Sequence, residues 1–251
     1  MKNSRILLFL LVLFFGLFQI VNAQTTEATN AISAGSYLGT SNGQNVIFKK
    51  GNVNSGFIKS NSTAFGYNSL SPDNNIYENA AFGAYAMQLA VDAYSKRNTA
   101  IGHGALKDLL LGQNNTFVGF ETGRLRTGGV GNTAIGFKAG GESGNNNTFV
   151  GAGSGVKNQG GNNTYLGLNT GYWNTNGSSN ILIGYTAGGG STATGGNSNI
   201  LIGSYAGVEM KGGSNNIVMG RYAGRFMDGG TRNVILGENA AKDMNLSLIH
   251  I

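Results

Sequence analysis

Apolar residues and glycines recur along this chain in one short pattern. The segment Asn-Asn-Thr-Phe-Val-Gly at 114–119 returns as Gly-Asn-Thr-Ala-Ile-Gly at 131–136 and unchanged at 146–151. Alignment on the closing glycine gives eleven copies, spaced 15 to 19 residues apart, which end at Gly66, Gly83, Gly102, Gly119, Gly136, Gly151, Gly167, Gly184, Gly203, Gly220 and Gly237. Repetition at so short a period is typical of a stacked solenoid, in which a single unit cannot bury its apolar face alone.

Each copy has the composition of a short β-strand. The residue before the glycine is always bulky and apolar, from Phe65 to Leu236, and the copies are short and rich in Thr, Ile, Val and Phe. Because side chains alternate along a strand, positions one and three before the glycine share one face, and position two lies on the other. The sequence therefore predicts an all-β chain, a parallel β-solenoid of about eleven coils of 15–19 residues.

Both faces of these strands are apolar, especially in the C-terminal half of the chain. A solenoid interior covers one face, and strands that are apolar on both sides are normally covered on both sides. No segment predicts a helix that would provide the second cover. We therefore expect other copies of the same chain to pack around a common axis. We also expect a brief second strand in each coil, for example at 125–127 and 208–210.

Asparagine and glycine mark the predicted corners. Glycine permits φ > 0 or close backbone approach, and Asn stands four residues before it in ten copies. Stacked Asn side chains repeat every ~4.8 Å, the spacing of neighbouring strands, and form a hydrogen-bonded ladder. The residue three after the glycine is always Ala, Ser or Thr, which predicts a tight bend. The structural repeat positions include Asn98, Gly102, Asn115, Gly119, Asn132, Gly136, Asn147, Gly151, Asn163, Gly167, Asn180, Gly184, Asn199, Gly203, Asn216, Gly220, Asn233 and Gly237.

The N-terminal part of the chain lacks the repeat. Residues 1–23 are a predicted secretory signal peptide, with Lys2 and Arg5 before an apolar run and a small-residue cleavage site at 21–23. Residues 24–60 predict a cap or adaptor that carries a hairpin and covers the first coil.

The repeats then occupy residues 61–245, and the last six residues break their register. This segment, Leu-Ser-Leu-Ile-His-Ile at 246–251, looks foreign to the protein. We expect that it is a non-native tail and that the natural C-terminus is missing.

Composition narrows the classes of function. The chain has 17 basic and 11 acidic residues, a formal net charge of +6, and loss of Lys2 and Arg5 with the signal peptide leaves +4. These charges are scattered singly, which argues against a nucleic-acid partner. The sequence has no Cys, so disulfides play no part despite export.

Candidate chemistry is sparse. Only His103 and His250 occur, and no His or Cys spacing fits a zinc or iron site. Calcium-binding solenoids place Asp in every glycine-rich turn, whereas the acids here fall at unmatched positions. No pair of carboxylates is suggested for sugar cleavage. We therefore expect no catalytic residue, no metal and no cofactor.

The two positions after each glycine vary freely and hold many aromatic residues. Aromatic side chains on a repetitive surface can bind glycans or protein partners, or they can pack at seams between subunits. Both interpretations stay open. The candidate ligand surface comprises Phe120, Phe137, Tyr172, Trp173, Tyr185, Tyr205 and Tyr222.

A rank of threonines stands three residues before the glycine in the early copies. Such ranks are similar to those of ice-binding solenoids, but here Ile and Val replace Thr in the last four copies. That replacement favours a buried rank over an ice-binding surface.

The motif resembles the YadA-like head of trimeric autotransporter adhesins, whose unit is close to Asn-Ser-Val-Ala-Ile-Gly followed by a small residue. The segments 98–102 and 132–136 match it nearly letter for letter, with Ala105 and Ala139 as the small residues. The likeness covers about 62–241. It implies a left-handed parallel β-roll, three chains packed side by side, and a head that binds host or matrix surfaces.

The chain departs from that family in some respects. The family's unit is shorter and more uniform, and the sequence has no stalk or membrane anchor, so contact with a membrane requires a C-terminal anchor that is missing here. The segment 37–70 also looks like the start of tail-fibre-like secreted proteins.

These features favour an exported, homotrimeric, adhesin-like fibre head, at the cell surface or outer membrane or outside the cell. Its expected partners are copies of itself and a host or matrix protein or a surface glycan. The alternative is a phage-type tail-fibre or appendage shaft that acts as a spacer. An ice-binding solenoid or a polysaccharide enzyme is less favoured.

Overall fold

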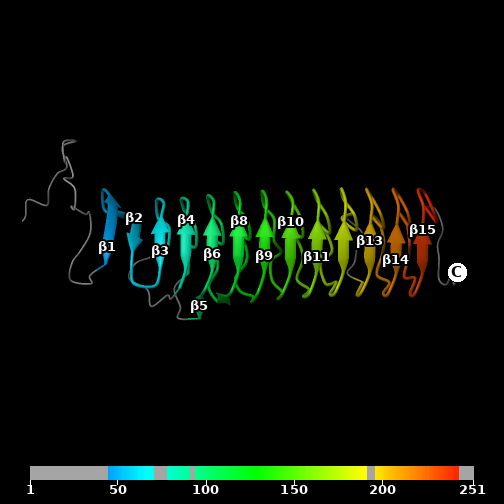
Figure 1. Ribbon diagram of the computed structural model, residues 1–251, viewed down its shortest axis with the longest axis horizontal. Helices are drawn as coiled ribbons and strands as arrows, with labels where there is room; N and C mark the ends of the chain where they lie inside the picture. Colours follow the sequence, from blue (N-terminus) through cyan, green and yellow to red (C-terminus); the bar gives the residue numbers. More distant parts are fainter. Residues whose placement is uncertain (1–44, 71–77, 91–93, 191–195, 243–251) are drawn as a thin grey trace, which may run out of the picture. The chain divides into compact units, whose positions relative to one another are not determined.

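All regular secondary structure in the described part of the chain is β-strand (Figure 1). The computed structural model describes residues 45–70, 78–90, 94–190 and 196–242. The predicted signal peptide, the first part of the predicted cap and the foreign-looking tail lie outside the described residues. The strands are β1 (Val46–Lys50), β2 (Val53–Ile58), β3 (Thr63–Phe65), β4 (Ala80–Phe82), β5 (Ser95–Lys96), β6 (Thr99–Ile101), β7 (Gly112–Gln113), β8 (Thr116–Val118), β9 (Thr133–Ile135), β10 (Thr148–Val150), β11 (Thr164–Leu166), β12 (Ile181–Ile183), β13 (Ile200–Ile202), β14 (Ile217–Met219) and β15 (Val234–Leu236).

The motif copies form one parallel ladder. Its strands follow the order β3-β4-β6-β8-β9-β10-β11-β12-β13-β14-β15, and Thr148, for example, lies between Thr133 and Thr164. The prediction of an all-β parallel solenoid is therefore confirmed. The solenoid has about nine turns, slightly fewer than the eleven coils expected.

A hairpin covers the first strand of the ladder, as Figure 1 shows. Strands β1 and β2 pair antiparallel around a turn at Gly51, whose φ of 61° favours glycine. Strand β2 then pairs antiparallel with β3, with Gly56 opposite Phe65. The hairpin expected within residues 24–60 is therefore present. It satisfies the backbone of a strand edge that would otherwise be open to pairing with another chain.

The residue two before each glycine lines the interior. These side chains are at most 4% exposed: Ala64, Ala81, Ala100, Phe117, Ala134, Phe149, Tyr165, Leu182, Leu201, Val218 and Ile235. The small residues three after the glycine are also buried, as the predicted tight bend requires. They include Ala86, Ala105, Thr122, Ala139, Ser154, Thr170, Ala187, Ala206 and Ala223.

Side-chain volume is shared between the strand and the corner that follows it. Where the strand offers only Ala81, the residue four after the glycine is Met87, which is fully buried. Where the strand carries Tyr165, the same corner position is Gly171, and a Cβ there would collide with the tyrosine ring. In both of these coils a single large side chain, either from the strand or from the corner, fills the interior and maintains close packing.

Buried asparagines form a continuous hydrogen-bonded ladder along the solenoid. The backbone N–H of Asn147 donates to Oδ1 of Asn132 at 3.0 Å, and its Nδ2 donates to the same oxygen at 3.2 Å and to the Gly160 carbonyl at 2.9 Å. The Oδ1 of Asn147 accepts the backbone N–H of Asn163 at 2.9 Å. The predicted ladder is therefore confirmed. It begins at Ser62 and continues through Asn79, Asn98, Asn115, Asn132, Asn147, Asn163, Asn180, Asn199, Asn216 and Asn233.

The closing glycine of each motif allows neighbouring coils to touch. Gly102 has a φ of 132°, and a Cβ at this position would collide with the carbonyl of Gly119 in the next coil. A side chain is therefore excluded both by backbone conformation and by contact. The closing glycines predicted as corners all have positive φ, from Gly66 to Gly237.

An arginine from one coil satisfies the backbone of the shortest coil, which spans 136–151. Arg126 is fully buried, and its guanidinium donates to the carbonyls of Gly141 at 3.0 Å and of Gly144. The group also lies 5.6 Å from the centre of the Phe117 ring. Burial lowers the pKa of Arg126 to about 10, so the guanidinium remains charged at neutral pH.

The second strands expected at 125–127 and 208–210 do not form. Outside the main ladder and its hairpin, the described residues contain the short parallel pair β5 and β7 and two isolated parallel bridges, Gln113 with Val130 and Lys211 with Asp228. Left-handed corners at Gly123 (φ 59°) and Gly207 (φ 55°) interrupt the extended backbone just before these segments. Neighbouring coils still exchange single backbone hydrogen bonds here, such as the one at 2.9 Å from the Glu209 N–H to the Arg225 carbonyl.

We predict that Asn163→Ala destabilises the solenoid. The change removes the side-chain partners of the Asn180 N–H and the Gly177 carbonyl, which lie at 2.9 and 2.8 Å. Each buried group left unsatisfied costs about 1–3 kcal/mol. Urea unfolding followed by circular dichroism measures the loss.

The matched control for this change is Asn176→Ala, because Asn176 is exposed. Surface substitutions of this kind change the free energy of unfolding by about 0.5 kcal/mol or less. Equal unfolding midpoints for the two variants would contradict the role of the ladder.

Candidate functional site

The outward face of the parallel ladder is apolar along its length. Residues directly before the glycines remain partly exposed, from Phe65 at 37% to Leu236 at 62%. In the C-terminal copies the residue three before the glycine adds a second apolar row, with Ile181 at 40% and Ile217 at 36% exposed. The prediction that the strands are apolar on both sides is therefore confirmed, and the single chain covers only the inner side.

The threonine rank lies on this outward face. Thr99, Thr116 and Thr133 are half-buried, whereas Thr148 and Thr164 are exposed. The expectation of a buried rank is therefore not met within the chain. The reason is that position two before the glycine, and not position three, points into the solenoid.

Aromatic side chains after the glycines form a first row along the N-terminal coils. The rings of Tyr67, Tyr85, His103, Phe120 and Phe137 follow one another at centroid distances of 5.8, 5.5, 5.2 and 5.6 Å. The structure thus brings together two of the predicted ligand residues, Phe120 and Phe137. His103 belongs to the same row. In the sequence this residue was of interest only as a possible metal ligand.

Tyr185, Tyr205 and Tyr222 form a second row, with centroid distances of 5.1 and 4.9 Å. The pKa of Tyr205 is raised, first by a hydrogen bond with Tyr185. Tyr222 is also flanked by cations, with the guanidinium carbons of Arg221 and Arg225 at 4.7 and 5.5 Å from the ring centre. Non-aromatic residues such as Leu168 separate the two rows.

Tyr172 and Trp173 form a separate pair at another part of the coil, five and six residues after Gly167. Their centroids are 5.2 Å apart, and Trp173 is 41% exposed. The seven predicted ligand residues therefore form three groups rather than one surface.

Three of the six neighbouring ring pairs in the two rows are stacked face to face, and the other three are T-shaped, with planes 73–80° apart. The planes of His103 and Phe120 differ by 11°, those of Phe120 and Phe137 by 10°, and those of Tyr205 and Tyr222 by 7°. A ring can stack on a sugar only through a free face. The stacked pairs therefore support neighbouring coils, and each stacked ring has one face fewer for a sugar.

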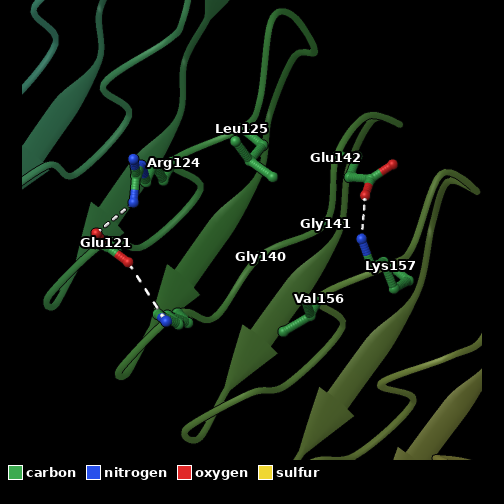
Figure 2. Close-up of a pocket in the computed structure, with 9 residues that line it drawn as sticks. Glu121, Arg124, Leu125, Gly140, Gly141, Glu142, Val156 and Lys157 are labelled. Atoms are coloured by element: carbon green, nitrogen blue, oxygen red, sulfur yellow. Dashed lines mark hydrogen bonds and ion pairs between the residues drawn. The ribbon is translucent and has the colours of Figure 1, made fainter.

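A hollow of about 200 Å³ lies beside the shortest coil. It is lined by residues of three successive coils: Glu121, Arg124, Leu125, Lys138, Gly140, Gly141, Glu142, Val156 and Lys157. Figure 2 shows the Gly140–Gly141 backbone between an ion-paired group on each side.

The charged side chains of the hollow are paired with one another. Glu121 contacts Arg124 at 2.6 Å and Lys138 at 3.5 Å, and Glu142 contacts Lys157 at 2.9 Å. The hydrogen bond from Lys157 lowers the pKa of Glu142, and the same bond raises the pKa of Lys157. Both members of this pair are therefore charged at neutral pH.

The hollow lies where the shortest coil has glycine at a position that carries a side chain in both flanking coils. The position five after the closing glycine is Arg124 in one coil, Gly141 in the next and Val156 in the third. A Cβ at Gly141 would collide with the carbonyl of Asn158 in the next coil, so glycine permits this close approach. The sequence analysis did not identify this site, although the spacing of 15 residues and Gly141 are both visible in the sequence.

The described residues contain no group of three or more His, Cys, Asp or Glu side chains placed to hold a metal ion. Within the same residues no helix is long and apolar enough to cross a membrane. Comparisons with protein-family models, with curated proteins and with solved structures found no match.

We predict that Phe120→Ala lowers stability more than Leu168→Ala. Both residues directly follow a closing glycine and have similar exposure, 46% and 44%. Phe120 stacks on two rings, and each aromatic pair contributes about 0.5–1.5 kcal/mol beyond area burial. Thermal or urea unfolding measures the difference between the variants. An equal loss of stability for both variants would show that the rings do not support one another.

Proposed function

We propose that this chain is the head of an exported, homotrimeric surface fibre that mediates adhesion to cells or matrix. Its location is the cell surface, the outer membrane or the extracellular space. In this proposal the solenoid is the left-handed β-roll of the YadA-like heads that the motif resembles. Its partners are two further copies of the chain and a host protein or surface glycan.

The observation that carries the proposal is the outward apolar face. Large exposed apolar patches on soluble proteins typically mark interaction sites. Here the apolar positions before the glycines extend over the whole ladder, from Phe65 to Leu236. A second copy of the chain carries the same face with the same spacing, so it matches this face without any further adaptation. Three copies around one axis follow from the resemblance.

A second candidate function is a rigid spacer in a tail-fibre or appendage shaft. The aromatic rows favour it, because His103, Phe120 and Phe137 use their ring faces to stack on one another. In such a shaft the rows stiffen the solenoid, and ligand binding belongs to another part of the assembly.

We predict that the chain from Gln24 onward forms a trimer in light scattering. Ile183→Lys should shift it to smaller species, because Ile183 lies on the outward face, and an unpaired charge buried at a seam is strongly unfavourable. Asn176→Lys adds the same charge at an exposed position and should leave the trimer intact. A well-folded monomer of the parent chain would count against the trimer.

Adhesion and the spacer role differ in their response to the aromatic surface. We predict that the triple change of Tyr185, Tyr205 and Tyr222 to Ser reduces retention of the protein on cells or matrix, because an adhesive head loses part of its exposed contact area. Circular dichroism controls for folding. Retention equal to that of the parent protein, with folding preserved, would favour the spacer.

A further inference from the structure

We propose that the hollow in Figure 2 binds one carboxylate-bearing sugar residue, such as a uronic acid unit of a surface glycan. The proposal deepens the adhesion function and rests on it for the source of the sugar. The arguments come from the size of the hollow, its charge and its walls.

The size of the hollow limits its occupant to a single small unit. Its volume is about 200 Å³, whereas pockets for drug-sized ligands have volumes of roughly 300–1,000 Å³. A single sugar ring is of the right order, and a longer glycan would extend from the hollow along the surface of the solenoid.

The charge of the hollow favours a monoanion. Three cations, Arg124, Lys138 and Lys157, face two carboxylates, Glu121 and Glu142, which leaves one positive charge in excess. A sugar carboxylate carries one negative charge and balances that excess. A phosphate monoester carries about −1.5 to −2 at neutral pH and would meet two fixed carboxylates, so it fits less well.

Lys138 is the cation best placed to turn toward a ligand. Its ammonium lies 3.5 Å from Glu121, and its side chain is 52% exposed. The guanidinium of Arg124 donates to Glu121 through one nitrogen, and its remaining N–H groups form the planar fork that matches a carboxylate.

The other groups of the hollow match the rest of a sugar ring. Leu125 and Val156 supply apolar contacts from the two flanking coils. Each carboxylate oxygen of Glu142 has one partner, Lys157 or Gln159, and a carboxylate has about four lone-pair sites. Sugar hydroxyls can therefore donate to Glu142 without breaking its existing hydrogen bonds.

The electrostatics of the hollow fit binding rather than cleavage. Glycoside hydrolysis needs a carboxylic acid whose pKa is raised, so that it can protonate the leaving group. The pKa of Glu142 is lowered instead, first by its hydrogen bond from Lys157. Glu142 is therefore a hydrogen-bond acceptor here and not a general acid.

Isothermal titration calorimetry of the chain from Gln24 onward tests the site with four probes: glucuronate, glucose, glucose 6-phosphate and glutamate. We expect glucuronate to bind at least ~tenfold more tightly than the other three, and more weakly as salt screens the charges. Lys138→Glu should weaken glucuronate binding by ~tenfold or more, because it reverses the excess charge. The control Lys107→Glu makes the same change outside the hollow and should bind like the parent.

No binding of glucuronate, or equal loss in the two variants, would overturn the site. Glutamate binding as tightly as glucuronate would show that a carboxylate alone suffices and would overturn the sugar assignment. Glucose 6-phosphate as the tightest ligand would overturn the charge argument. Light scattering and retention on cells are measured on the same samples. If the protein does not adhere to cells but still binds glucuronate, the proposed function is wrong and the binding site stands. If it adheres to cells but does not bind glucuronate, the binding site is wrong and the proposed function stands.

Discussion

The hydrogen bonds of the buried asparagines fix the register of the whole solenoid. Three-residue strands alone provide few ladder bonds, but each asparagine, such as Asn147, also binds the coils before and after it. The closing glycines fix the other end of each strand, because only a residue without Cβ allows the contact from Gly102 to Gly119. With both ends of each strand fixed, every strand residue stays in register with its counterparts in the neighbouring coils. Interior and outward positions therefore stay separate along the entire ladder.

The chemistry of the surface arises where coils depart from the repeat. The coil at 136–151 is the shortest, and its backbone is satisfied by Arg126 from the preceding coil. The same coil places Gly141 between Arg124 and Val156 of the flanking coils, where the three residues border the hollow. The repeat thus provides a rigid frame, and a local shortening provides a site. The aromatic rows contribute mainly to the frame, since their rings are satisfied by one another.

The repeat made most of the fold predictable from the sequence. Alternation around each glycine identified the strands, and the single position shared by the asparagines identified the ladder. The prediction of second strands at 125–127 and 208–210 was wrong, because the sequence pattern did not reveal the left-handed corners before these segments. The hollow was missed because its residues are unremarkable one at a time. Glu121 and Lys138 both stand two residues after a closing glycine, and Glu142 and Lys157 both stand six after, so stacking of the coils brings each pair together.

The paired volumes of Ala81 with Met87 and of Tyr165 with Gly171 show that a regular coil fills much of its own cross-section, whereas the space beside Gly140 is filled by the ring of Phe117 from the preceding coil. A regular coil carries its interior residues, and the asparagine and closing glycine that contact its neighbours, within one stretch of sequence. Recombination between gene segments that encode such units can therefore add or delete a coil without requiring a new interface. The length of the solenoid becomes a quantity that evolution can adjust by copy number, while the ends and the irregular coils retain their individual character.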